Sequence, residues 1–227
     1  MKTVPLSLHA LLLAPLFFAG CMTAPHPDSS GWEDLFDKNL SNAEFPAGSW
    51  HYTSDGWLEP TQGETIFSKK DYKSVVLDTV YVLPADANSG IFFYDSDHKS
   101  RKKFEVQLLD DRSPVFKDVK SYQNTGSVYG RCAASELRAR PAGEENRMTV
   151  WCEGGHIRVY LNGGKIVDME MDDYYNPVEN PDGTRVPWYM DGTPALASIP
   201  RHGRIGLQGI HNTKVPVRFK YVKIKEL

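Results

Sequence analysis

Apolar and polar residues alternate along many short segments of this chain, and the clearest case surrounds Phe104. Side chains two residues apart share one face of a β-strand, so the pattern predicts a strand with Phe104, Val106 and Leu108 in the core. Glu105 and Gln107 would then occupy the opposite face. A carboxylate and an amide on one rigid face could bind two hydroxyls of a sugar ring. The alternative interpretation is that both merely face water on an antiparallel sheet.

Two further regions predict long or consecutive strands. Residues 148–171 predict three strands in a row, because Gly154-Gly155 and Asn162–Gly164 are turn signals between alternating runs. Such a series is a β-meander. Residues 73–83 predict the longest strand, whose apolar face would consist of Val75, Leu77, Tyr81 and Leu83.

Another strand is predicted next to the first one described. Ile91 and Phe93 would form its inner face, and Phe92 and Tyr94 its outer face. We expect this outer face to be the one that carries Glu105.

Residues 172–202 lack periodicity and are rich in Asp, Asn, Pro and Tyr, with one helical turn expected near 194–198. Structureless segments of this length are uncommon in compact domains unless they cover a site, so the segment predicts a functional surface. Beyond it, Gln208 would face outward beside Gly206, whose missing side chain leaves room for a ligand or an aromatic ring.

These patterns define the fold class. Many short strands with turn punctuation and no helical periodicity predict an all-β, two-sheet antiparallel sandwich of the jelly-roll kind. A chain of 227 residues suffices for one such domain, expected over 31–227. The 26 Lys and Arg residues are balanced by 29 Asp and Glu residues, a net charge of −3, so no nucleic-acid partner is expected.

The N-terminus has the features of a lipoprotein signal. Residues 1–20 carry Lys2 and a short apolar run, which is typical of an export signal, and the small residues before Cys21 resemble a lipoprotein processing site. Lipidation of Cys21 would anchor the protein in the bacterial cell envelope through a tether over 21–30. Met22 rather than Asp predicts the outer membrane, on its periplasmic or its outer side. The alternative is an ordinary signal peptide cut near Ala24.

Two cysteines remain, Cys132 and Cys152. An even pair in an exported protein predicts a disulfide, and the alternative is two unpaired small apolar residues. No CxxC motif or His cluster accompanies either cysteine, so neither predicts a metal site.

Six short blocks, taken in order, carry a resemblance to a known family. The set resembles the 3-keto-disaccharide hydrolase family from about Gly31 to Leu227. The resemblance implies a jelly roll of the concanavalin A-like lectin/glucanase type, and action on glycosides whose sugar is oxidised to a ketone at C3. The blocks are Trp32–Asp37, Asn88–Ile91, Phe104–Asp110, Thr125–Tyr129, Leu161–Gly163 and Gly203–Gln208.

The chain departs from the family pattern at two places. Tyr94 stands where the family often has Arg, which puts a cationic oxyanion stabiliser in doubt, and Glu145 stands before Asn146 where the family often has Trp. A divalent metal could take the role of the missing Arg, although no ligand constellation in the sequence requires one.

A ketone at C3 acidifies the C2 proton, so the bond at C1 can break by elimination followed by hydration. This chemistry needs a base, a stabiliser for the enolate and an acid for the leaving group. We expect Glu105 to act as base or acid, Asp110 to be a second carboxylate, and His211 to be an acid or a metal ligand. The expected substrate contacts are Gln107, Gln208, Tyr94, Tyr129 and Asn88.

Three alternatives stay open. An ordinary glycosidase would need two acids at a fixed separation, and the acidic strand motif of lectin-like glucanases is absent because Gln107 interrupts it. A carbohydrate-binding lipoprotein could use Tyr94, Tyr129 and Trp188 as stacking platforms. A structural envelope protein would neither bind nor cleave sugars. The enzyme reading also requires an oxidoreductase partner that produces the ketone.

Overall fold

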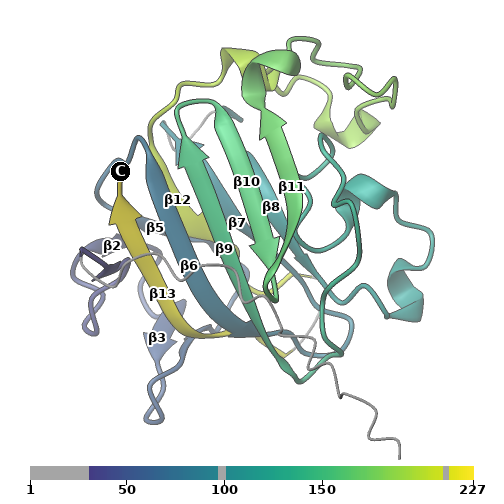
Figure 1. Ribbon diagram of the computed structural model, residues 1–227. Helices are drawn as coiled ribbons and strands as arrows, with labels where there is room; N and C mark the ends of the chain where they lie inside the picture. The colour runs from purple at the N-terminus through teal and green to yellow at the C-terminus, as the bar shows by residue number, and fades with distance from the viewer. Residues whose placement is uncertain (1–30, 97–100, 212–214) are drawn as a thin grey trace, which may run out of the picture.

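Two antiparallel β-sheets face each other in the computed structural model, which describes residues 31–96, 101–211 and 215–227 (Figure 1). The larger sheet has eight strands in the order β11-β10-β9-β6-β13-β4-β3, with β1 paired to β13. Its strands are β1 (Glu33–Asp34), β3 (Trp50–Tyr52), β4 (Leu58–Pro60), β6 (Val75–Val82), β9 (Glu145–Glu153), β10 (His156–Leu161), β11 (Gly164–Glu170) and β13 (Arg218–Glu226).

The smaller sheet has five strands in the order β2-β5-β12-β7-β8. They are β2 (Ala43–Glu44), β5 (Ile66–Ser68), β7 (Asn88–Asp95), β8 (Phe104–Leu109) and β12 (Arg204–Leu207). The helical content of the described residues is five single turns: η1 (Pro114–Phe116), η2 (Ser121–Gln123), η3 (Met171–Asp173), η4 (Trp188–Met190) and η5 (Leu196–Ser198). None of their helices is long and apolar enough to cross a membrane. The predicted all-β two-sheet sandwich is confirmed.

The core lies between the two sheets and follows the predicted alternation. Phe104, Val106 and Leu108 of β8 are buried in it, each side chain contributing about 1.5–3 kcal/mol through the apolar area it removes from water. The predicted apolar face of β6 is confirmed, because Val75, Leu77, Tyr81 and Leu83 all belong to the same cluster. The meander is confirmed as β9, β10 and β11, each pairing with the next.

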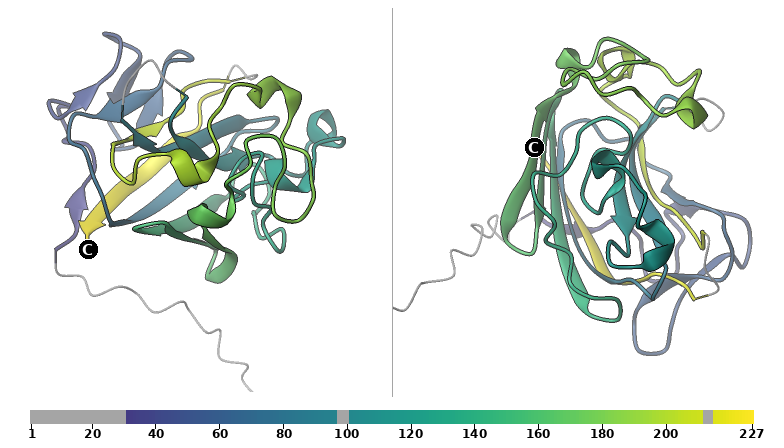
Figure 2. Two further views of the ribbon diagram at one scale, coloured as in Figure 1. Left: turned by 90° about the horizontal axis from the view of Figure 1, so that it is seen from above. Right: turned by 90° about the vertical axis from the view of Figure 1, so that its right-hand side faces the viewer.

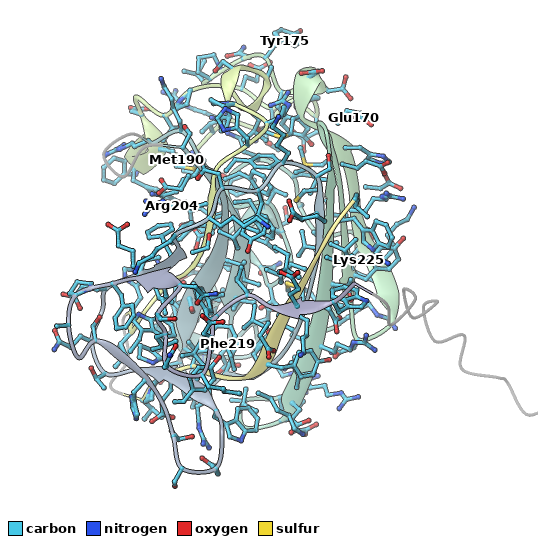
Figure 3. All side chains as sticks on the ribbon, turned by 90° about the vertical axis from the view of Figure 1, so that its left-hand side faces the viewer. Glu170, Tyr175, Met190, Arg204, Phe219 and Lys225 are labelled. Atoms are coloured by element: carbon cyan, nitrogen blue, oxygen red, sulfur yellow. The ribbon has the colours of Figure 1, made fainter. Side chains whose placement is uncertain are left out.

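Residues 171–203 cross from β11 in the larger sheet to β12 in the smaller one, over one end of the sandwich (Figures 1 and 2). We call this segment the crossing loop. The predicted helical turn is present as η5, and η3 and η4 add two more turns. Figure 3 shows Met190 and Tyr175 of the crossing loop toward the end of the molecule opposite the core residue Phe219.

The predicted orientation of Tyr94 is wrong. Its backbone has a left-handed φ of 61°, and the pairing of β7 with β12 shifts register there. This irregularity reverses the alternation, so Tyr94 turns into the core, where it is 1% exposed. Its ring meets Phe104 edge-on at 5.6 Å. Tyr94 therefore cannot contact a substrate on the outer face.

The predicted disulfide is also wrong, because both cysteines are free thiols. Cys152 is buried in the core on β9, where it is paired in register with Val75 and Ile157. Cys132 lies in the loop after β8, where its Sγ is 3.8 Å from the Ala133 carbonyl. The predicted signal, tether and lipidated Cys21 lie outside the described residues.

Candidate functional site

Glu105 lies on the outer face of the smaller sheet, as the alternation predicted. Strand pairing places it opposite Phe92, which in turn is opposite Gly206 of β12, and Gly206 is opposite Phe67 of β5. A Cβ atom on Gly206 would lie 2.5 Å from the Phe67 ring. The space that Gly206 leaves is therefore filled by an aromatic ring rather than left open for a ligand.

A second glycine shapes the surroundings of Glu105. Gly90 pairs with Gln107, two residues along the strands from the pair formed by Phe92 and Glu105. A Cβ atom on Gly90 would lie 2.0 Å from Oε1 of Glu105 and 2.7 Å from its Cγ. The Glu105 side chain therefore lies directly over Gly90, and only glycine admits it there.

A cavity of about 270 Å³ opens above Glu105, at the end of the sandwich that the crossing loop covers. This volume is near the lower end of ligand pockets and suits a single sugar ring. The smaller sheet and the segment before β8 contribute one wall, the loop after β8 a second, and the crossing loop a third. The lining residues are Phe92, Arg101, Lys103, Phe104, Glu105, Tyr129, Arg131, Tyr189, Met190, Thr193, Pro194, Leu196 and Ile199.

Glu105 is the one carboxyl that the described part of the chain contributes to this cavity. Burial raises the pKa of Glu105 to about 8, although the nearby Lys103 ammonium opposes the rise. No hydrogen bond to the carboxyl is found within the part of the chain that the structure describes. A carboxyl with a pKa near the working pH can both accept and return a proton, which is the property of a general base.

Three cations share the cavity with Glu105. Lys103 lies two residues before Glu105 in the sequence. Its Nζ is 3.2 Å from Asp95 Oδ1 and 5.3 Å from the centroid of the Phe92 ring. Arg101 is exposed and donates from Nη1 to the carbonyl of Asp191 at 3.1 Å. The third cation is Arg131, which is 2% exposed.

Arg131 fixes both limbs of the crossing loop. Its Nη1 donates to the carbonyls of Asn176 and Pro177 at 3.2 and 3.4 Å. Its Nη2 donates to Thr193 Oγ1 at 3.4 Å and to the carbonyl of Pro194 at 3.0 Å. These acceptors are all uncharged, so the guanidinium keeps its positive charge without a carboxylate partner among the described residues.

An aromatic cluster stands beside the cavity. Tyr129 and Tyr189 both line it, with ring centroids 6.2 Å apart, and their hydroxyls are 3.2 Å apart. Gln123 Nε2 donates to both hydroxyls, at 3.2 and 2.8 Å. Trp188 meets Tyr189 edge-on at 5.8 Å and is 76% exposed. Planar faces and hydroxyls gathered in this way suit a sugar or another planar group.

Comparison with known proteins decides the family. Residues 31–225 match the model of the 3-keto-alpha-glucoside-1,2-lyase-like domain. The chain belongs to this family. The resemblance to 3-keto-disaccharide hydrolases that the six blocks predicted is thereby confirmed. None of the proteins with curated descriptions matches the chain.

Solved structures with the same fold agree with this family assignment. The crystal structure of "Putative glycosyl hydrolase" from Parabacteroides distasonis ATCC 8503 is 34% identical, with a TM-score of 0.81, over 86% of this chain and 99% of that one. A Bacillus subtilis protein with a galectin-like fold (10% identity, TM-score 0.53) covers 86% of this chain and 94% of its own. The VIP36 exoplasmic/lumenal domain bound to Ca²⁺ and Man₃GlcNAc (11%, 0.51) covers 89% and 90%. The last two show the jelly-roll fold alone. Together the comparisons support a glycoside-acting or carbohydrate-binding role.

The amides of Gln107 and Gln208, both predicted to contact the substrate, lie beside the cavity and not in its lining. Gln107 is 2% exposed and donates to Asn88 Oδ1 at 3.4 Å. Gln208 sits across Gly90 from Gln107, because its backbone N–H donates to the Gly90 carbonyl. The Oε1 atoms of Gln107 and Gln208 are both buried without a hydrogen-bond partner. These two amides keep an unused acceptor each on the face that carries Glu105.

Asp110 does not form a pair with Glu105. A strand rises about 3.3 Å per residue, so five residues separate the two by about 16 Å. Oδ2 of Asp110 instead accepts the Asp86 backbone N–H at 3.1 Å, and Oδ1 accepts that of Arg112 at 3.3 Å, so it fixes a turn. The structure therefore does not bring Asp110 to the cavity that holds Glu105.

His211 forms a backbone bridge with Asn88 and is exposed, four residues along β7 from the position opposite Glu105. It does not line the cavity. Across the described ranges, no three His, Cys, Asp or Glu side chains gather where they could hold a metal ion.

Sequence reasoning missed Arg131, Lys103 and Tyr189. Arg131 and Tyr189 sit in segments without periodicity, so no pattern indicated which way they point. The one available signal was the length of the segment 172–202, which did predict that a site lies beneath it.

Proposed function

We propose that this protein cleaves glycosides whose sugar carries a ketone at C3, by removing the C2 proton and eliminating the group on C1. The observation that carries this proposal is Glu105, the single carboxyl that the described residues contribute to the cavity. Its pKa is about 8, and the other charged side chains of the lining are cations. An elimination next to a ketone needs one base and a positive environment for the enolate, and this set supplies both.

In the proposed reaction the Glu105 carboxylate takes the C2 proton, and the electron pair of the C–H bond moves onto the ketone as an enolate. The enolate then re-forms the carbonyl while C1 and C2 become doubly bonded and the C1–O bond breaks. The leaving oxygen takes up one proton. Water added later across the C1–C2 double bond gives the free 3-keto sugar, so the net result is hydrolysis.

Positive charge lowers the energy of the enolate. Arg131 and Lys103 line the same cavity as Glu105, and Arg131 forms no ion pair with a carboxylate of the described residues. A cation in a water-poor site acts more strongly than in bulk water, because the local dielectric is low. Arg131 could therefore act as the cationic stabiliser of the enolate, the role that Tyr94 at position 94 leaves unfilled.

An ordinary two-carboxylate glycosidase fits less well. Retaining and inverting enzymes place two carboxyls about 5–9.5 Å apart across the bond. Of the residues that the structure describes, the cavity lining offers Glu105 and no second carboxyl, and Asp110 follows the far end of β8.

The test compares a chromogenic 3-keto-glucoside with the same glucoside before oxidation, each with and without a chelator. Release of the chromophore from the keto compound alone is expected, and E105Q should lose at least about 100-fold in rate, the usual contribution of a general base. Equal release from both compounds would refute the proposal. The chelator arm reports any need for a metal.

A second candidate function is carbohydrate binding without turnover. The observation that favours it is the exposed aromatic surface of Trp188 beside Tyr189. A binding protein would show saturable affinity for sugars and release no product from the keto compound.

Location and partners complete the proposal. Lipidation at Cys21 would hold the domain at the cell envelope, in the outer membrane, and a separate oxidoreductase would supply the 3-keto substrate. The C21S variant should lose the mass of the lipid and move from the membrane to the soluble fraction. An unchanged membrane fraction would contradict the anchor.

A further inference from the structure

Three hydrogen bonds join Gln123, Tyr129 and Tyr189 into a closed triangle at the edge of the cavity. Gln123 Nε2 supplies two of them, one to each phenol oxygen. The orientation of this amide is fixed, because its Oε1 accepts the backbone N–H of Lys120 at 2.9 Å. An amide nitrogen has two hydrogens, and both are used here.

The third bond of the triangle links the two phenols and uses one phenol hydrogen. It runs from Tyr129 to Tyr189 over 3.2 Å. Tyr189 then accepts two hydrogen bonds, while its own hydroxyl hydrogen has no acceptor among the described residues. One phenol hydrogen is left over whichever way the third bond runs, and both phenols line the cavity.

We propose that Tyr189 donates the proton that the leaving oxygen takes up when the C1–O bond breaks. This assignment rests on the proposed function above, in which Glu105 removes the C2 proton. Tyr189 comes from the crossing loop, whereas Glu105 comes from the sheet, so the two groups reach a bound sugar from different walls. Tyr189 is 41% exposed, so its side chain is open to solvent as well as lining the cavity.

Gln123 stabilises Tyr189 after it has lost its proton. Hydrogen bonds to the charged form of a group favour that form, and the phenolate would keep the Gln123 amide as a donor. Burial, and then the hydrogen bond with Tyr129, raise the pKa of Tyr189, so the phenol keeps its proton until the leaving oxygen develops negative charge.

Protons balance over one turnover. Glu105 gains the C2 proton and Tyr189 loses its hydroxyl proton to the leaving oxygen. Release of the proton from Glu105 and reprotonation of Tyr189, through water, restore both groups. The substrate yields an unsaturated 3-keto sugar and an alcohol, with no oxidant or reductant consumed.

The test uses two substrates that differ in their need for a proton. 4-Nitrophenolate leaves without protonation, whereas methoxide does not, so 3-keto 4-nitrophenyl and 3-keto methyl glucosides separate the acid from the base. Y189F should lower kcat/KM for the methyl substrate by about 100-fold or more, the usual contribution of a general acid. For the 4-nitrophenyl substrate the loss should stay below about fivefold.

Y129F is the matched control, because it removes a neighbouring phenol of the same triangle and leaves the Tyr189 hydroxyl bonded to Gln123. Tyr129 lines the cavity, so Y129F can weaken substrate binding, but its loss should be similar for the two substrates. Comparable thermal unfolding midpoints of the two variants and the wild type establish that both are folded. A third measurement follows exchange of the C2 proton of the methyl substrate in D₂O. The exchange rate of Y189F should equal that of the wild type.

The outcomes separate two failures. Equal losses on both substrates in Y189F, with normal C2 exchange, would overturn the role of Tyr189 and leave the proposed function standing. Discrimination between the substrates in Y129F rather than Y189F would overturn it too, and would move the free proton to Tyr129. A wild-type product that keeps its original C2 hydrogen would overturn the proposed function, and this inference with it.

Discussion

Replacement of Gly90 by Ala tests whether the position of the Glu105 carboxyl matters. The new Cβ would lie 2.0 Å from Oε1, and such contacts are essentially never shorter than 3.0 Å, so the oxygen must move by about 1 Å. The Cγ atom at 2.7 Å must move as well, so the whole carboxyl end is displaced. A misplacement of about 1 Å can cost about 100-fold in rate.

The backbone should tolerate this change. Gly90 lies within β7, its φ is outside the left-handed region, and alanine is more favourable than glycine in a strand interior by about 0.5–1 kcal/mol. We therefore expect G90A to fold with a thermal midpoint close to that of the wild type. Its kcat/KM on a 3-keto-glucoside should fall by about 100-fold.

A double-mutant cycle provides the control. If G90A acts by moving the Glu105 carboxylate, it should add little to the loss already caused by E105Q, because both changes disable one group. Wild-type activity in G90A would refute the reasoning. So would a further 100-fold loss when G90A is added to E105Q, since the glycine would then act on something else.

Three further predictions follow from the cavity and the core. Because Glu105 must be ionised to act as base and its pKa is about 8, the rate of C2 proton loss should rise with pH through about 8 and then level off, as a pH profile can show. The unfolded chain releases this proton at lower pH than the folded protein, so the stability of the folded protein falls as pH rises toward 8. In urea unfolding, the free energy of unfolding of E105Q should exceed that of the wild type by about 1–3 kcal/mol at pH 9 and equal it near pH 4. R131M should lower the free energy of unfolding by about 2–4 kcal/mol, since part-buried carbonyls of the crossing loop lose the charged donor that holds them. A change below about 0.5 kcal/mol would contradict the anchoring role. Cys132 and Cys152 should both be alkylated after unfolding without a reductant, as mass spectrometry can count; protection of the pair would restore the disulfide.

The sequence predicted those parts of the fold that periodicity controls. The inner residues of β8 and β6 were correct because a period of two assigns each side chain to a face, and burial of one face fixes the register. The predicted orientation of Tyr94 was wrong because a single left-handed residue reverses the alternation. Apolar side chains lie on both sides of β7, so the sequence pattern does not reveal the reversal.

The site was harder to predict than the fold because half of it comes from loops. Glu105 was placed on the correct face by alternation alone. Asp110 lies near it in sequence, but an extended strand carries it out of reach. Arg131 and Tyr189 reach the cavity through contacts made by carbonyls and a distant glutamine, and such contacts leave no pattern in the sequence.

The fate of the hydrogen on C2 tests the central claim most directly. A 3-keto-glucoside cleaved in D₂O can be analysed by NMR as soon as product forms. The account predicts that the original C2 hydrogen is gone, leaving either an unsaturated sugar or a hydrated product with deuterium at C2, and that E105Q forms neither at an appreciable rate. A product that keeps its original hydrogen at C2 would contradict the account, because the C1–O bond would then have broken without proton removal by Glu105.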